Sequence, residues 1–358
     1  MKYYKISNSD GKEWLMPNKN IATGLLLYQP IAWRGKLLKA WFPVVNMIDV
    51  AGIVKRCLHI EEISNPISEK LRSLLCEIFK SSNLEFSIFT GTPCAHQKVT
   101  IQIYQGRNIL GYCKVSKNPE LIEIFQREKA YLDWLNDRKV NNVPKCLCCR
   151  RVENDMWIFV QTTTKTCQSR FSHMLGDLEL SFLRQLSEKT KCVVPFSQTE
   201  MFKSLNMLEE MGGLGNKDVI RAVEIVRDYY GHRREEVFSA YHSDFTPWNM
   251  FIDAGNLFVF DWEYAGRTYL PYLDIIHYIV QTNIFENKSD AKDLYDSLFV
   301  RNKRVLETYF SSPNIAVLSY LLDIIAKYSL RDKDHETPDT IMLQQKRVRL
   351  IHLVLQNI

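Results

Sequence analysis

The stretch HSDFTPWNMFIDAGNLFVFDWE, residues 242–263, carries the strongest structural signal in this chain of 358 residues. Within it, Asp244, Asn249 and Asp261 offer two carboxylates and one carboxamide. Two hydrophobic runs flank the sequence DAGN at 253–256, which is typical of a tight hairpin turn. Such a hairpin would return Asp261 to the side of Asn249, where oxygen atoms from both residues could bind one cation. Magnesium prefers hard oxygen ligands of this kind, completed by phosphates and water.

The spacing of these residues indicates phosphoryl transfer. Protein kinases have an Asp and an Asn five positions apart on the catalytic loop, and a metal-binding Asp after the next hairpin. By this reading Asp244 is the candidate catalytic base, with His242 as a second candidate catalytic residue. Asn249 and Asp261 are the candidate magnesium ligands against the phosphates of ATP. Any one of these residues could instead cap a turn or end a strand, so the ordered set carries the inference.

The residues upstream predict a small β-sheet lobe with a nucleotide-binding lysine. Strands are expected at 84–89, 98–104 and 109–115, followed by a helix at 120–135. Lys114 lies on the third strand and Glu128 lies on the helix, fourteen residues later. An ion pair between them would orient the lysine toward the α- and β-phosphates.

The expected phosphate-covering turn is less specific. It has the single glycine Gly91, followed by Thr92, where protein kinases have G-x-G-x-x-G. Gly91 and Thr92 could therefore cover a nucleotide or form an ordinary hairpin turn. Lys98, just beyond the turn, could add a phosphate contact, although a solvated surface lysine is the favoured alternative.

The run H-x-D-x-x-x-x-N followed by Asp-Trp-Glu resembles the aminoglycoside phosphotransferase and choline kinase group of small-molecule kinases. The resemblance covers roughly residues 84–285. In that group a triplet such as Asp-Trp-Glu stands where protein kinases have Asp-Phe-Gly. The resemblance implies that Asp244 is the catalytic base and that Asn249 and Asp261 are the magnesium ligands. It also implies that Lys114 binds the phosphates and that Glu128 is its partner.

Two further matches to this group and one departure from it concern details. Asp274 matches a position that supports the catalytic loop, and Ser243 stands where the group usually has glycine. Ser243 supplies no group that the chemistry requires. The Gly-Thr-Pro turn at 91–93 resembles a subset associated with surface-polysaccharide biosynthesis.

The expected fold is therefore α+β, a protein-kinase-like fold of two lobes. A small antiparallel β-sheet lobe at 81–162 would precede a mainly helical C-terminal lobe at 163–358, which carries the catalytic loop and the acceptor site. Residues 1–80 would form a basic N-terminal extension that packs on the small lobe.

The N-terminal extension accounts for the positive charge of the chain. Residues 1–80 hold twelve Lys or Arg and seven Asp or Glu, a balance of +5 that equals the net charge of the whole chain. Residues 32–42 predict a basic amphipathic helix that Gly35 and Pro43 would keep short. Such a helix could rest on an anionic membrane surface. We expect instead that its large apolar side chains pack on the small lobe, namely Trp33, Leu37, Leu38 and Trp41.

Composition is that of a globular protein, with 46% hydrophobic residues. No apolar run reaches the roughly 18 residues of a membrane span, and the first residues lack an apolar signal core. Nine scattered cysteines favour a reducing cytoplasm. Cys146 to Cys149 could bind zinc, but a strand with small apolar side chains is favoured. No basic stripe with interleaved aromatic residues predicts nucleic-acid binding.

The sequence thus predicts ATP- and magnesium-dependent transfer of a γ-phosphoryl group to a hydroxyl of a small molecule, such as a sugar, an amino alcohol or an aminoglycoside-like compound. A non-catalytic nucleotide-binding scaffold is the alternative from another class. A protein kinase is disfavoured because no Ala-Pro-Glu segment follows Asp261.

Overall fold

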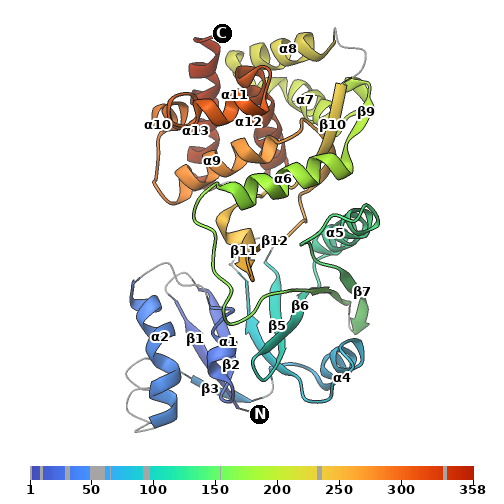
Figure 1. The fold of residues 1–358 in the computed structure, drawn as a ribbon, viewed down its shortest axis with the longest axis vertical. Coiled ribbons are helices and arrows are strands. Elements are labelled where there is room, and N and C mark those ends of the chain that lie inside the picture. The colour runs from blue at the N-terminus through green and yellow to red at the C-terminus, as the bar shows by residue number, and fades with distance from the viewer. Residues whose placement is uncertain are drawn as a thin grey trace. The chain divides into compact units, whose positions relative to one another are not determined.

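A computed structural model describes residues 2–8, 11–28, 33–48, 61–64, 66–91, 97–153, 155–231, 236–333 and 337–358 (Figure 1). Thr92 of the predicted phosphate-covering turn lies outside these residues. The chain divides into two compact units. Unit 1 comprises Met1–Asn136, Val143–Arg170 and Asp253–Phe258, and unit 2 comprises Asp137–Asn142, Phe171–Ile252 and Val259–Ile358.

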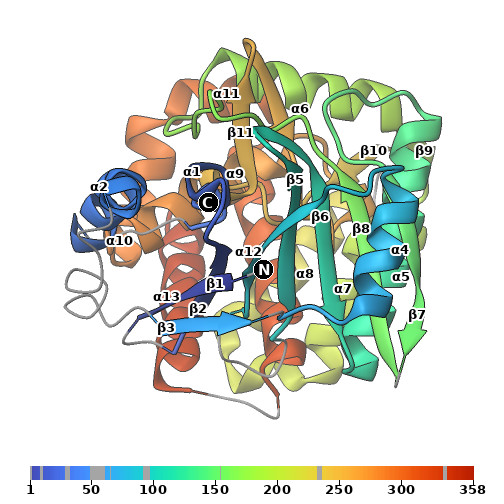
Figure 2. The same cartoon turned by 90° about the horizontal axis from the view of Figure 1, so that it is seen from below.

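Unit 1 is built on an eight-stranded antiparallel sheet with the order β3-β1-β2-β4-β5-β6-β8-β7 (Figure 2). The three strands predicted at 84–89, 98–104 and 109–115 are confirmed as β4, β5 and β6. Strands β3 and β7 form the two edges, and the pairing of β7 with β8 shifts register at two places. The strands are β1 (Lys2–Ser7), β2 (Glu13–Pro17), β3 (Glu61–Ser64), β4 (Glu85–Phe89), β5 (Val99–Gln105), β6 (Asn108–Ser116), β7 (Cys146–Glu153) and β8 (Met156–Thr162).

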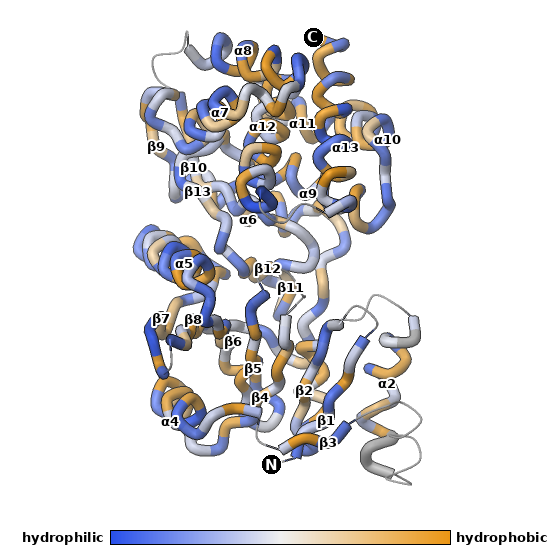
Figure 3. Tube along the Cα trace, turned by 180° about the vertical axis from the view of Figure 1, so that it is seen from behind, coloured by the Kyte–Doolittle hydropathy of each residue, from blue (hydrophilic) through white to orange (hydrophobic). Residues whose placement is uncertain are grey.

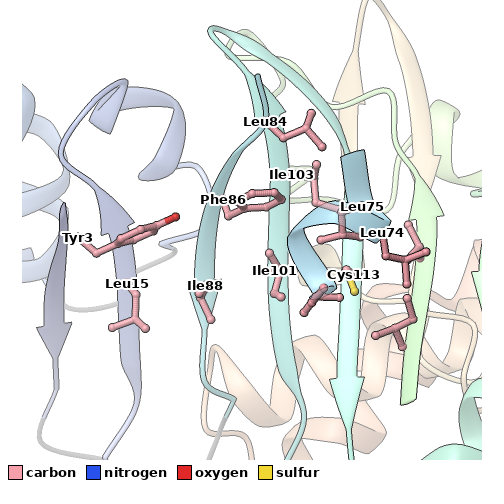
Figure 4. Close-up of a cluster of buried hydrophobic side chains, with 13 residues drawn as sticks. Tyr3, Leu15, Leu74, Leu75, Leu84, Phe86, Ile88, Ile101, Ile103 and Cys113 are labelled. Atoms are coloured by element: carbon pink, nitrogen blue, oxygen red, sulfur yellow. The ribbon is translucent and has the colours of Figure 1, made fainter. Parts of the chain in front are cut away.

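Helix α4 (Glu69–Ile78) supplies much of the core of unit 1 (Figure 4). It begins at Ser68, whose side chain accepts a hydrogen bond from the backbone N–H of Leu71 at 3.2 Å. Leu71, Leu74 and Leu75 are buried, and their spacing puts them on one face of the helix. That face packs against apolar side chains of the sheet, including Phe86, Ile88, Ile101, Ile103, Cys113, Ile158 and Val160.

A second hydrophobic cluster joins the N-terminal strands to α1 (Ile21–Gly24) and α2 (Trp33–Ile48). Helix α2 continues past Pro43 to Ile48, so the predicted helix at 32–42 was too short. Phe42 is 1% exposed and Leu38 packs against the cluster. The other members of this cluster are Tyr4, Ile6, Trp14, Met16, Ile21, Leu25 and Tyr28.

The predicted packing of the α2 side chains is wrong for three of its four residues. Trp33, Leu37 and Trp41 are 66%, 47% and 62% exposed. The reason is helical geometry. Trp33, Leu37 and Trp41 are spaced four residues apart and therefore share one face, and a rotation of about 100° per residue places Leu38 on a different face. Leu38 packs against the cluster, whereas the side chains of Trp33, Leu37 and Trp41 are exposed.

Unit 2 is mainly helical, and α12 (Pro313–Arg331) forms its centre, with buried residues throughout 315–326 (Figure 3, hydrophobic residues in orange). Helices α7, α8, α9 and α13 pack against α12. The other helices are α6 (Asp177–Thr190), α7 (Glu200–Glu210), α8 (Lys217–Gly231), α9 (Leu273–Phe285), α10 (Ala291–Asp296), α11 (Lys303–Tyr309) and α13 (Pro338–Leu355).

The remaining elements of the chain are short, apart from the long helix α5 (Pro119–Asp137) next to the sheet of unit 1. A three-stranded sheet in unit 2 has the order β13-β10-β9, and β11 pairs with β12 as the predicted hairpin. These strands are β9 (Cys192–Val194), β10 (Glu236–Tyr241), β11 (Met250–Asp253), β12 (Asn256–Val259) and β13 (Gly266–Tyr269). Single turns are η1 (Phe196–Gln198), η2 (Gly212–Gly215), η3 (Pro247–Asn249) and η4 (Ser297–Arg301).

None of the helices in the described part of the chain is by itself long and apolar enough to cross a membrane. Helices α11 and α12 meet the length and apolarity of a span only when they are taken together, and the chain bends by 90° between them.

Candidate active site

The predicted catalytic loop begins where β10 ends, and α9 holds it in place. The carboxylate of Asp274, in the first turn of α9, accepts hydrogen bonds from the backbone N–H groups of His242 (2.9 Å) and Ser243 (3.1 Å). Asp274 is 2% exposed. Two charge-assisted bonds from one buried carboxylate fix the backbone at the start of the loop. This contact agrees with the supporting position that the family resemblance implied for Asp274.

Ser243 has a left-handed backbone conformation, with φ at +69°. This conformation costs more free energy for a residue with a Cβ atom than for glycine. The difference explains why glycine is usual at this position in the family that the sequence resembles. The serine hydroxyl accepts a hydrogen bond from the Lys327 amine at 2.9 Å. The side chain therefore adds a link between the loop and α12 that glycine could not make.

His242 joins the two halves of the motif. Its Nδ1 accepts from the backbone N–H of Asp244 (3.2 Å), and its Nε2 lies 3.0 Å from the carbonyl oxygen of Phe260. These partners assign the single proton to Nε2 and leave the ring neutral. Burial lowers the pKa of His242 to about 4, which keeps it neutral. Both ring nitrogens are thus engaged, one within the loop and one just after β12, and a catalytic role for His242 stays a prediction.

Asp244 and Asn249 are in direct contact. The Asn249 amide Nδ2 donates to the Asp244 carboxylate at 2.6 Å and to its carbonyl oxygen at 3.0 Å. This orientation leaves the amide oxygen of Asn249 for another ligand. The backbone N–H of Phe260 donates to the carbonyl oxygen of Asn249 at 3.0 Å, so the chain returns to Asn249 one residue before Asp261. The predicted hairpin thus brings these three residues together within unit 2.

The surroundings of Asp244 disfavour its charge. Burial raises the pKa of Asp244 to about 7, and the nearby charges of Asp261 and Glu263 act in the same direction. The carboxylate nevertheless keeps 31% of its side-chain surface exposed. A carboxylate that titrates near neutral pH and reaches solvent is suited to accept a proton from a bound hydroxyl.

The sequence did not single out His277, which lies on α9 with Nε2 at 3.4 Å from Asp244 Oδ1. His277 is fully buried, and neither ring nitrogen has a hydrogen-bond partner among the described residues. Burial lowers the pKa of His277 to about 3, and the charges of Lys327 and Arg347 lower it further. Its one sequence signal is the i, i+3 spacing from Asp274, which places both side chains on one face of the helix.

We expect the stability contributed by His277 to depend on pH. Its folded pKa of about 3 lies below the ordinary value of about 6.5, so the unfolded chain binds the extra proton as pH falls. Stability is therefore fully present above pH 6.5 and is lost below it, and His277→Asn removes this loss. Between pH 6.5 and 5.5, the free energy of unfolding of the wild type should fall relative to the variant by about 1 kcal/mol.

Urea unfolding of both proteins at several pH values measures this difference. The charged groups that face His277 are Asp244, Asp323, Lys327 and Arg347, and they are the same in both proteins. His352→Asn, at an exposed position on α13, is the matched control. A difference between wild type and His277→Asn that stays constant with pH would contradict the neutral buried ring.

In unit 1, the predicted ion pair is present. Lys114 on β6 lies 2.6 and 2.9 Å from the two carboxylate oxygens of Glu128 on α5. Lys114 is 5% exposed and Glu128 is fully buried. The amine also lies 5.4 Å from the centre of the Phe159 ring. Such a buried, bidentate pair fixes the lysine amine at one place on the sheet.

The predicted phosphate-covering turn has a structural reason for its glycine. Gly91 has φ at +90°, and a Cβ atom there would lie 2.4 Å from the carbonyl oxygen of Lys98. The close approach of the two strands accounts for Gly91 without a ligand. Lys98 is half-buried, and its role in phosphate binding stays a prediction, as does that of Gly91.

The antiparallel sheet unit with its Lys–Glu pair and the helical unit with its Asp–Asn–Asp loop form the two lobes of an α+β, protein-kinase-like fold. The solved structures that share this fold include aminoglycoside phosphotransferase APH(4)-Ia. A thermostable mutant of that protein, in a ternary complex with ADP and hygromycin B, matches with a TM-score of 0.53 and 15% identity over 80% of this chain and 98% of that chain.

The apo form of a thermostable APH(4)-Ia mutant gives a TM-score of 0.52 and 16% identity, over 80% of this chain and 99% of that one. A ternary complex with AMP-PNP and hygromycin B gives 0.51 and 15%, with the same coverage. At this identity the likeness shows the fold. No protein-family model matches the chain. No curated protein matches its sequence.

Proposed function

We propose that the chain is an ATP- and magnesium-dependent phosphotransferase that moves the γ-phosphoryl group to a hydroxyl of a small molecule. The observation that carries this proposal is the contact between Asp244 and Asn249, with the chain returning to Asn249 just before Asp261. The fold of the APH(4)-Ia structures, which were solved with ADP or AMP-PNP, supports it.

In the proposed reaction, Asp244 orients the acceptor hydroxyl and accepts its proton. The amide oxygen of Asn249 and the carboxylate of Asp261 fit a magnesium ion, since both are hard oxygen donors. Magnesium, when bound, would neutralise charge on the nucleotide phosphates. Asp274 and His242 hold the loop backbone, so that Asp244 needs little reorganisation during the reaction.

In unit 1, Lys114 is the proposed contact to the nucleotide, and Glu128 holds its amine in place. A lysine fixed in this way contacts the α- and β-phosphates in kinases. Gly91, Thr92 and Lys98 remain proposed contacts to the phosphates. The cytoplasmic location and the link to surface polysaccharides likewise remain predictions.

The side chains near Asp244 favour an acceptor that carries a negative charge. Burial raises the pKa of Tyr328, and the charge of Asp244 raises it further. Two guanidinium groups contact its ring, Arg331 at 4.0 Å and Arg347 at 4.4 Å from the ring centre. Asp332 neutralises Arg331, with contacts of 2.6 and 3.0 Å.

Arg347 differs from Arg331 in having no carboxylate within ion-pair distance among the described residues. It is 2% exposed, its Nη1 donates to Gln344 at 3.0 Å, and its Nε has no hydrogen-bond partner among them. An unpaired buried charge costs free energy that a bound anion would offset. We therefore propose a sugar that bears a carboxylate or phosphate, in preference to a cationic aminoglycoside or amino alcohol.

Four acceptors that share one ring and differ in charge test both parts of the proposal: glucosamine, glucose, glucuronate and glucose 6-phosphate. ADP release is measured with ATP, with and without magnesium. We expect magnesium-dependent turnover, and a kcat/KM for the anionic sugars at least about tenfold above that for glucosamine, equivalent to ~1.4 kcal/mol. Arg347→Gln should reduce this preference.

The matched control is Arg227→Gln, since Arg227 also lies over an aromatic ring, that of Phe202, and pairs with Glu209. It should leave the preference unchanged. Turnover of glucosamine at or above that of the anionic sugars would exclude an anionic acceptor but not a kinase. Nucleotide binding without ADP release on any acceptor would favour the alternative of a non-catalytic scaffold.

A further inference from the structure

Helix α2 is attached to unit 1 by one face. Phe42 is buried and contacts the ring of Tyr4 edge-on, with ring centres 5.7 Å apart. Leu38 packs against the same cluster. The amine of Lys39 donates to the carbonyl oxygen of Tyr28 at 2.6 Å. These contacts fix which face of the helix points away from unit 1.

The opposite face carries a continuous apolar stripe. Trp33, Leu37, Trp41 and Val44 follow one another at spacings of four, four and three residues, and are 66%, 47%, 62% and 46% exposed. These spacings place all four side chains on one side of a helix. A stripe with two tryptophans exposed by more than half marks an interaction surface rather than an ordinary solvated helix.

The charges of α2 indicate what the stripe contacts. The helix contains Arg34, Lys36 and Lys39 and no acidic residue. Lys36 is exposed and directly precedes Leu37 of the stripe in the sequence. The first 80 residues also carry the entire net charge of the chain, +5. An apolar stripe with tryptophans and only basic charges is the composition of a helix that lies in an anionic membrane surface.

We infer that α2 docks in the plane of an anionic membrane surface and brings unit 1 to it. Trp33, Leu37, Trp41 and Val44 enter the region between headgroups and acyl chains, where indole rings are favoured. Lys36 reaches back to the lipid phosphates with its amine. A protein partner is less well matched, because the charged residues of α2 are all basic and lysine is depleted in protein interfaces. This inference does not depend on the proposed function.

Cosedimentation of the full chain with vesicles tests it, with phosphatidylcholine alone and with phosphatidylcholine mixed with phosphatidylglycerol. We expect binding to the mixed vesicles that weakens as salt is added, and little binding to phosphatidylcholine alone. Trp41→Glu should reduce the partition coefficient at least about tenfold. It removes one large apolar side chain that the membrane would bury, and it adds a negative charge that the anionic lipids repel. Lys36→Glu should reduce it less.

Val300→Glu is the matched control, because Val300 is 66% exposed in unit 2 and lies outside the stripe. It should bind vesicles as the wild type does. Melting temperatures of all variants show that each is folded. Absent binding to anionic vesicles, or equal binding to both vesicle types, would overturn the inference. Concentration-dependent dimerisation that Trp41→Glu abolishes, without vesicle binding, would assign the stripe to a second copy and overturn it too.

Discussion

Replacing Asp244 with asparagine should lower kcat roughly 10²–10⁴-fold, the usual contribution of a positioned acid–base group. Asparagine has the same shape and can still accept the hydrogen bond from Asn249 that now reaches Asp244 at 2.6 Å. It cannot take a proton from the acceptor hydroxyl. Steady-state ADP release at saturating ATP measures the loss, with the acceptor that the wild type uses best.

Stability should not fall in the same variant. Burial raises the pKa of Asp244 to about 7. Above that pH the folded protein therefore carries a negative charge at Asp244 that its surroundings disfavour. Neutral asparagine removes this penalty, and the melting temperature at pH 8 should rise. Asp339→Asn, at an exposed position in the first turn of α13, is the control that should change neither property. An Asp244→Asn variant that retains wild-type kcat would exclude Asp244 as the base.

Replacing Glu128 with alanine should destabilise the chain by about 3–5 kcal/mol, because it leaves the buried amine of Lys114 without its carboxylate. Lys114 is 5% exposed, so water cannot replace the lost partner without opening the sheet. Chemical unfolding measures the change. Asp133→Ala is the matched control on the same helix, since it breaks the exposed pair with Lys129 and should cost no more than about 1 kcal/mol.

The double variant Lys114→Met with Glu128→Leu separates stability from function. An apolar pair of similar volume often replaces a buried ion pair without loss of stability. The apolar rings of Phe125 and Phe159 lie in the same part of the core and should accommodate it. We expect recovery of most of the lost stability and no recovery of nucleotide-dependent turnover. Equal stability of Glu128→Ala and the double variant would show that the ion pair is not the source of the loss.

Local sequence signals predicted the elements around the site well. The DAGN turn, the strands β4, β5 and β6 and the long helix that carries Glu128 all occur where alternation and helical periodicity placed them. The Lys114–Glu128 contact followed from the kinase pattern of a strand lysine and a helix glutamate, and of the three glutamates on α5 it is Glu128 that makes it. The structure therefore confirms the fold, while the chemical roles of these residues stay predictions.

Other features could not be predicted because they depend on pairing between distant segments. The sequence indicated an N-terminal extension that packs on the small lobe, but not that β1, β2 and β3 extend the same sheet as β4. It likewise identified α2 as amphipathic without indicating which face packs on the protein. The approach of His277 to Asp244 joins residues 33 positions apart through the placement of α9. No local pattern reports such contacts.

The two edges of the eight-stranded sheet determine how this protein behaves at high concentration. An open sheet edge is a template for strand addition and fibrillar aggregation. The β3 edge is short, and it exposes Glu61 and Glu62, which pair with Lys5 and Lys2 of β1 and leave charged side chains along the edge. The β7 edge exposes Arg150 and Arg151, and its two register shifts break the flat hydrogen-bonding row. Charge and irregularity together protect a wide sheet from polymerising, and neutralising either edge would weaken that protection.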